Sequence, residues 1–165
     1  MAGYKGHIAG GLVTAVACTF AVSLLPYEQL SAYADLLQGW QTLAGVFIVA
    51  MLFALFPDVD IKSKGQSLFY WLIFIVDALL IWNKQIQAAA YLGVIALLPL
   101  LSKHRGWTHS VVAAFLIPSP IVLVPYLYSE RIVAVAVLFY GAAVVGYLSH
   151  IALDGQLVRR LKRLL

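Results

Sequence analysis

Six long stretches of the chain are almost continuously apolar, and the polar residues gather between them. The stretches cover residues 8–25, 39–56, 67–82, 86–101, 110–128 and 132–151. A helix that crosses the hydrocarbon core of a bilayer needs about 20 mostly apolar residues. The stretches approach that length, and they lack the alternation of apolar and polar residues that marks the strands of a membrane barrel. The pattern therefore predicts an all-α polytopic membrane protein, a bundle of about six transmembrane helices.

The composition supports this class. Of the 165 residues, 63% are hydrophobic and 11% are charged, whereas soluble domains are roughly 45–50% apolar and about 25% charged. A water-soluble globule and a disordered chain are both excluded. The single cysteine, Cys18, excludes a disulfide framework within the chain. No internal repeat or long linker interrupts the sequence, so we expect one transmembrane domain over residues 1–154.

Basic residues predict the orientation of the bundle. With the N-terminus in the cytoplasm, six spans leave only Lys84 and Arg131 outside. The basic residues on the inside are then Lys5, Lys62, Lys64, Lys103, Arg105, Arg159, Arg160, Lys162 and Arg163. The positive-inside rule favours this topology, with both termini in the cytoplasm.

The C-terminal tail, residues 155–165, interleaves leucines with basic residues at helical spacing. This pattern predicts an amphipathic helix that lies on the anionic inner leaflet. Binding to nucleic acid is the weaker alternative, because the charges are mixed with leucines.

The predicted topology places seven potential metal ligands at the inner membrane face. They are His7, Asp58, Asp60, His104, His109, His150 and Asp154. His150 and Asp154 are four residues apart and share one face of a helix. Histidine mixed with aspartate suits Zn²⁺ first, then Mn²⁺ or Fe²⁺, and carboxylates that can bridge favour two ions, so we expect one or two ions at this site. A metal-free polar network that ties helix ends together is the alternative.

A metal centre of this kind suits hydrolysis of a phosphoester, because a bound metal lowers the pKa of water toward about 7. Arg105 offers a planar fork that matches phosphate, or it is a structural partner of the nearby aspartates. Lys62, Lys64 and Lys103 surround it, either as further contacts to phosphate or only as topology determinants. A lipid with a phosphorylated head group would fit.

The turn before the fifth stretch adds two polar residues to the predicted substrate contacts, Thr108 and Ser110. We expect Thr108 to cap the following helix, with His109 in its first turn. The free amides at that helix start favour an anion.

Two further features lie inside the predicted spans. Asp77 is an intramembrane acid, and such acids mark functional sites by default, although a protonated carboxyl bonded to a neighbouring helix is the plainer interpretation. Glycines at positions 10, 11, 141 and 146 are expected to permit close packing of helices.

Three sequence strings carry a resemblance to a known family: His-Arg-Gly-Trp-Thr-His-Ser at 104–110, Pro-Asp-Val-Asp at 57–60, and Gly-Tyr-Leu-Ser-His-Ile-Ala-Leu-Asp at 146–154. The chain resembles the YdjM-like family of bacterial membrane-bound metal-dependent hydrolases, which is distantly similar to zinc-dependent phospholipase C. The resemblance implies an inner-membrane location and makes the seven residues above ligands or catalytic groups. Ile61 departs from the pattern, because family members often have histidine there, which weighs against a complete second metal site.

The sequence thus predicts an inner-membrane hydrolase with a divalent metal centre that faces the cytoplasmic leaflet. Six residues would bind metal, His7 would be a ligand or general acid, and His109 and Arg105 would take part in catalysis. Two alternatives remain. One is a transporter or channel that uses Asp77, and the other is a non-catalytic scaffold that recruits a partner through the tail.

Overall fold

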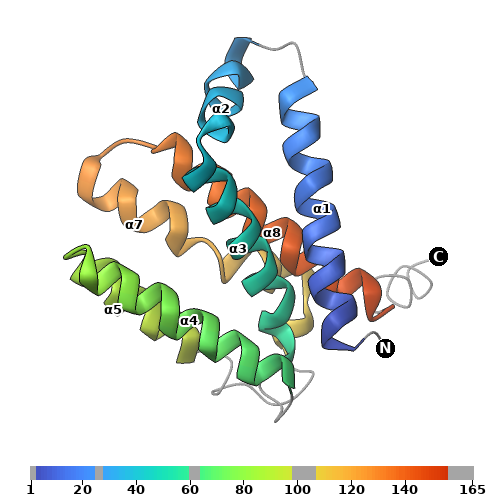
Figure 1. The fold of residues 1–165 in the computed structure, drawn as a ribbon. Coiled ribbons are helices and arrows are strands. Elements are labelled where there is room, and N and C mark those ends of the chain that lie inside the picture. Colours follow the sequence, from blue (N-terminus) through green and yellow to red (C-terminus); the bar gives the residue numbers. More distant parts are fainter. Residues whose placement is uncertain (1–2, 25–27, 60–63, 98–106, 156–165) are drawn as a thin grey trace.

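The computed structural model describes residues 3–24, 28–59, 64–97 and 107–155 (Figure 1). The described residues form helices and no strand. The α-helices are α1 (Tyr4–Leu24), α2 (Glu28–Gln38), α3 (Trp40–Leu55), α4 (Lys64–Trp82), α5 (Ile86–Leu97), α6 (Val111–Leu116), α7 (Pro120–Ser129) and α8 (Ala134–Leu153). Two short 3₁₀ helices, η1 (Phe56–Asp58) and η3 (Trp107–His109), carry site residues.

Helices α1, α3 and α8 form the centre of the molecule and pack against one another (Figure 1). Ala50 of α3, which is fully buried, is in close contact with both neighbouring helices. A Cβ atom placed on Gly146 of α8 would lie 2.2 Å from the Ala50 carbonyl oxygen, and one on Gly11 of α1 would lie 2.7 Å from the Ala54 Cβ. Both glycines therefore permit close packing, as predicted. Gly141 does not, because nothing lies within 4 Å of the corresponding position.

Helices α4 and α5 form a hairpin that leans away from this centre (Figure 1). The Tyr70 hydroxyl of α4 donates a hydrogen bond of 3.2 Å to the Ala96 carbonyl of α5. Between the hairpin and helices α3, α7 and α8 lies an apolar cavity of about 330 Å³, lined for example by Phe53, Ile73 and Leu92. The hairpin thus leaves a space beside the bundle.

The predicted spans are confirmed in part. Among the described residues, four helices are long and apolar enough to cross a membrane: Tyr4–Leu24, Trp40–Asp58, Lys64–Trp82 and Ala134–Leu153. The helix expected over 110–128 is broken into α6 and α7, because Pro118 and Pro120 interrupt the hydrogen-bond ladder between them. Helix α2 was not predicted. The six-span count and the orientation of the bundle stay predictions.

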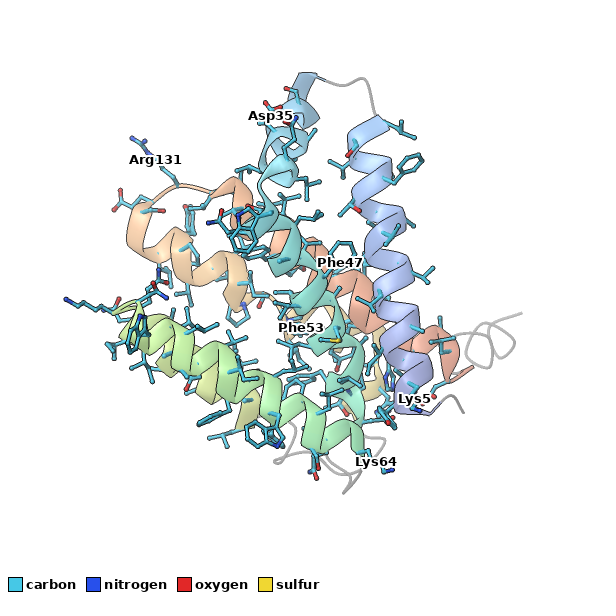
Figure 2. All side chains as sticks on the ribbon, in the orientation of Figure 1. Lys5, Asp35, Phe47, Phe53, Lys64 and Arg131 are labelled. Atoms are coloured by element: carbon cyan, nitrogen blue, oxygen red, sulfur yellow. The ribbon has the colours of Figure 1, made fainter. Side chains whose placement is uncertain are left out.

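Figure 2 labels charged residues at both ends of the molecule. Lys5 and Lys64 lie at the end where α1 and α4 begin, and Asp35 and Arg131 lie toward the other end. The C-terminal helix predicted over 155–165 falls almost wholly outside the described residues, as does the end of the stretch at 86–101.

Candidate metal centre

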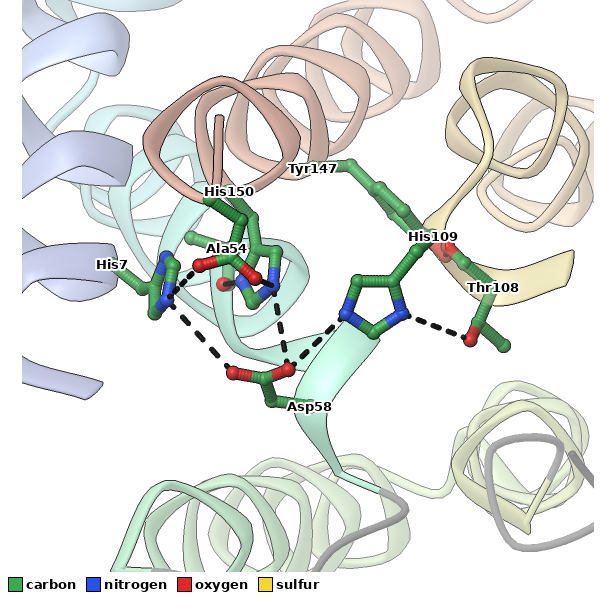
Figure 3. A network of polar contacts seen from close by, with 8 residues as sticks. His7, Ala54, Asp58, Thr108, His109, Tyr147 and His150 are labelled. Carbon is green, nitrogen blue, oxygen red and sulfur yellow. Dashed lines mark hydrogen bonds and ion pairs between the residues drawn. The ribbon is translucent and has the colours of Figure 1, made fainter. Parts of the chain in front are cut away.

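Five predicted site residues converge at one end of the three central helices (Figure 3). His7 lies in the first turns of α1, Asp58 ends η1, and His109 ends η3. His150 lies in the last turn of α8, and Asp154 is the C-cap residue of that helix. Segments more than 140 residues apart in the sequence are thereby brought to one point, which the helix packing at Ala50 makes possible.

Local structure aims two of the carboxylates. Pro57 occupies the first turn of η1, where its missing N–H costs nothing, and the tighter 3₁₀ winding turns Asp58 toward α1 and α8. At the end of α8, the Asp154 amide donates to the His150 carbonyl at 3.0 Å. This bond keeps the helical winding through Asp154, so that the two side chains stay on one face.

Four of these side chains form a compact set that could hold a metal ion. His7, Asp58, His150 and Asp154 each offer one potential ligand atom, and these atoms all lie within 4.8 Å of one another. His7 Nε2 lies 3.4 Å from Asp154 Oδ1 and 3.8 Å from Asp58 Oδ2. His150 Nε2 lies 3.5 Å from Asp58 Oδ1 and 3.7 Å from Asp154 Oδ2. Each imidazole therefore faces both carboxylates.

These separations are too long for strong direct hydrogen bonds, and two of the four match the spacing of ligands on a shared cation. A charge-assisted N–H···O bond is about 2.7–2.9 Å long, and all four distances exceed this. In a tetrahedral site with ligands about 2.0–2.2 Å from zinc, neighbouring ligand atoms lie about 3.3–3.6 Å apart. The donor set of two imidazoles and two carboxylates suits Zn²⁺, Mn²⁺ or Fe²⁺.

The orientation of His150 supports the same interpretation. Its Nδ1 lies 2.8 Å from the carbonyl oxygen of Ala54 in α3, so Nδ1 carries the proton and donates it. In the neutral ring the lone pair is then on Nε2, which faces two carboxylates that also only accept. A backbone carbonyl that fixes the tautomer in this way is the usual partner of a metal-binding histidine. The sequence gives no sign of this contact, because Ala54 contributes through its backbone.

The two imidazoles of the set are stacked. The ring centroids of His7 and His150 lie 3.8 Å apart with an angle of 17° between the planes. Both stacked rings present Nε2 to the same two carboxylates, Asp58 and Asp154. Both imidazoles are therefore placed to bind one cation, which histidine does in its neutral form.

His109 lies beside this set rather than within it. Its Nε2 lies 3.2 Å from Asp58 Oδ1, and its Nδ1 lies 3.4 Å from the Thr108 hydroxyl (Figure 3). The Tyr147 hydroxyl donates a hydrogen bond to the Thr108 carbonyl and so ties η3 to α8. Tyr147 was not predicted as part of the site. Its position three residues before His150 places both on one face of α8, and this spacing was the available signal.

Burial differs sharply among the ligating groups. The His7, His150 and Asp154 side chains are at most 1% exposed, whereas the Asp58 side chain is 24% exposed. Asp58 therefore lies at the mouth of the centre. Water or a substrate would approach from its side.

Some of the other predicted site residues are described by the structure, and the rest lie outside the described residues. Ser110, not Thr108, caps the following helix, since its hydroxyl accepts a 3.0 Å bond from the Ala113 amide. The prediction for Thr108 was wrong because the chain makes one turn of 3₁₀ helix first, which leaves His109 before α6. Lys64 is exposed at the start of α4. Outside the described residues lie Asp60, Lys62, Lys103, His104 and Arg105.

One protein-family model matches the part of the chain that contains the whole site. The family model described as YdjM inner membrane protein matches residues 1–159, which include every residue of the centre. The chain belongs to the YdjM inner membrane protein family. No curated protein and no solved structure matches it. Membership and the apolar helices make this a membrane protein.

Proposed function

We propose that this YdjM-family chain is a metal-dependent hydrolase that cleaves a phosphoester in a membrane lipid at the cytoplasmic leaflet. The observation that carries the proposal is the convergence of two imidazoles and two carboxylates within 4.8 Å of one another, at the end of membrane-length helices. Buried charges near lipid are costly unless they are paired or bind a cation. The almost complete burial of three of these four side chains therefore supports a bound cation.

The residues divide the work as follows. His7, Asp58, His150 and Asp154 would hold a divalent cation, with Zn²⁺ first and Mn²⁺ or Fe²⁺ as alternatives. When bound, such a cation activates water and stabilises negative charge on a phosphoryl group. His109, 3.2 Å from Asp58, would move a proton between water and the leaving group. His7 stays in the ligand set, since it contacts both carboxylates.

A lipid substrate is supported by the position of the centre. Lys5 and Lys64 lie at the end of the molecule where α1 and α4 begin (Figure 2). The partly exposed Asp58 contacts His7 near the start of α1, and η1, which it ends, contacts α4, so a phosphorylated head group there would meet positive charge. Thr108 is buried, so its predicted contact to substrate is replaced by a role in holding His109. Ser110 is used as a helix cap. Contacts from Arg105, Lys62 and Lys103 to phosphate stay predictions.

Metal content and turnover of the purified protein test the proposal. We expect zinc or manganese near one equivalent by elemental analysis, and hydrolysis of phosphatidic acid, phosphatidylglycerol or a polyprenyl phosphate that chelation abolishes and added metal restores. His109→Gln should keep the metal and lower turnover by about 10²-fold or more, the usual contribution of a general acid or base. Protein that is hydrolytically inert in every metal-loaded form, or a fully active His109→Gln variant, would contradict it.

A transporter that uses Asp77 is the second candidate, and one observation favours it. The Asp77 Oδ1 atom is buried in α4 and has no hydrogen-bond partner among the described residues. Against it, the cavity beside α4 is walled by apolar side chains and offers no polar path. Flux into liposomes with Asp77→Asn separates the two, because the hydrolase tolerates this change. A scaffold that acts through residues 155–165 stays a prediction, since this tail is not described beyond Gly155.

A further inference from the structure

A second cavity, which has polar side chains in its lining, adjoins the apolar cavity beside the α4–α5 hairpin. The second cavity has a volume of about 310 Å³ and is lined by Lys84, Gln85 and Gln87 of the turn between the two helices and the start of α5. Both cavities are lined by the same four residues, Ala88, Tyr91, Val124 and Pro125. These four residues of α5 and α7, here called the neck, lie where the two cavities adjoin.

The apolar cavity is large, partly open to its surroundings and almost without polar lining. An apolar cavity of about 150 Å³ already binds benzene without water. This one measures about 330 Å³ between helices α3, α4, α5, α7 and α8. A buried water needs two to four polar partners, which its walls do not offer. Its lining therefore suits a hydrocarbon.

The polar cavity carries the complementary chemistry. Lys84 holds a backbone conformation with φ of 59°, and the turn is fixed by bonds of 2.9 Å from the Lys84 amide to the Ile81 carbonyl and 2.8 Å from the Gln85 amide to the Leu80 carbonyl. No carboxylate in the described part of the chain forms an ion pair with Lys84. A lysine ammonium is a point charge that binds phosphate, and the two glutamine amides add donors.

We propose that the two adjoining cavities bind one anionic phospholipid, with an acyl chain in the apolar cavity and the head-group phosphate at Lys84, Gln85 and Gln87. The charge at the mouth and the hydrocarbon surface behind it match the two parts of such a lipid. This site is separate from the metal centre. Phe56 and Phe69 line the apolar cavity and pack edge to face at 5.8 Å, and Phe56 also contacts Tyr147, so an aromatic layer lies between the two sites.

Native mass spectrometry of the purified protein after detergent exchange tests the lipid site. Titrated with dimyristoyl phosphatidylglycerol, the wild-type protein should retain one lipid at least 10-fold better than it retains dimyristoyl phosphatidylcholine. Ala88→Phe, which fills the neck, should lower this retention at least 10-fold, whereas Ala90→Phe, on the exposed face of α5, should leave it unchanged. Val124→Phe fills the neck from α7 and serves if Ala88→Phe does not fold.

The head-group assignment has its own matched pair. Lys84→Gln should remove the preference for phosphatidylglycerol, and Arg131→Gln, which also removes one exposed basic charge, should not. Equal retention by the Ala88→Phe, Val124→Phe and wild-type proteins would overturn the proposal, and so would a lipid-free dimer that both substitutions dissociate. Retention of the lipid should be the same with and without a chelator, because the chelator removes only the metal. A failure of the metal centre can therefore be distinguished from a failure of the lipid site.

Discussion

Asp154 is the residue at which a metal centre and a metal-free polar network differ most. Its carboxylate is buried and lies 3.4 Å from His7 Nε2 and 3.7 Å from His150 Nε2. In a metal-free network, an amide in its place could donate to the His150 lone pair and relieve the crowding of acceptors. In a metal centre, the same replacement removes a charged ligand. One substitution therefore has opposite consequences under the two interpretations.

We expect Asp154→Asn to leave the unfolding temperature of the metal-free protein unchanged or higher, and to abolish the stabilisation by added Zn²⁺. A ligand at 100 times its dissociation constant stabilises by about 2.7 kcal/mol, and this increment should disappear. Thermal unfolding in detergent, with and without zinc, measures it. Asp35→Asn, on the exposed face of α2, is the matched control and should keep the full increment. A zinc shift that survives in Asp154→Asn would remove Asp154 from the ligand set.

The sequence predicts these residues unevenly. The His150 and Asp154 pair follows from helical spacing, and the gathering of His7, Asp58 and His109 with it follows from the ends of apolar stretches. The Ala54 carbonyl that fixes His150 has no sequence signal, because every residue carries a carbonyl. His109 lies beside the other four side chains rather than among them because one turn of 3₁₀ helix precedes α6. The residue types in this segment do not specify that turn.

At the scale of helices, the centre depends on how closely α8 approaches α3. Gly146 lies one turn before His150 on α8, and a Cβ atom there would meet the Ala50 backbone at 2.2 Å. Since neither backbone can give way locally, the helices must separate. The His150 bond to Ala54, one turn farther along α3, depends on the same contact.

We therefore expect Gly146→Ala to lower the free energy of unfolding by about 1–3 kcal/mol, the usual cost of overpacking, and to weaken zinc binding. Gly141→Ala is the matched control on the same helix. It meets nothing within 4 Å and gains up to about 1 kcal/mol of helix propensity. Unfolding and zinc titration of both variants measure the effect. Normal zinc affinity in a folded Gly146→Ala protein would show that the centre tolerates helix separation.

The helices themselves could be predicted better than their ends. Long apolar stretches gave α1, α3, α4 and α8 because twenty apolar residues have few other stable arrangements in lipid. Hydropathy alone cannot locate the break between α6 and α7, since prolines and their neighbours are nearly as apolar as the helices. Helix α2 escaped prediction because it is more polar and joins two spans.

For the whole molecule, the distribution of charge links the fold to the compartment in which the centre works. The same end of the bundle carries the metal-ligating groups and the exposed Lys5 and Lys64, whereas Arg131 lies toward the other end (Figure 2). The sequence predicts further basic residues on the side of Lys5 and Lys64, and under the positive-inside rule we expect that side to face the cytoplasm. The site would then meet lipids of the inner leaflet.

Single-cysteine labelling in intact cells tests this orientation. Cys18 is the single cysteine of the chain and is exposed on α1, so Cys18→Ala supplies the background. In that background, we expect a membrane-impermeant maleimide to label Arg131→Cys and Lys84→Cys from outside. Lys5→Cys and Lys64→Cys should react only after the membrane is permeabilised, which also serves as the control for accessibility. The reverse pattern would place the metal centre at the outer leaflet, where the substrate must be sought among different lipids. Labelling of Arg131→Cys without Lys84→Cys would show that the hairpin of α4 and α5 does not cross the bilayer with the other helices, and would leave the orientation of the centre unchanged.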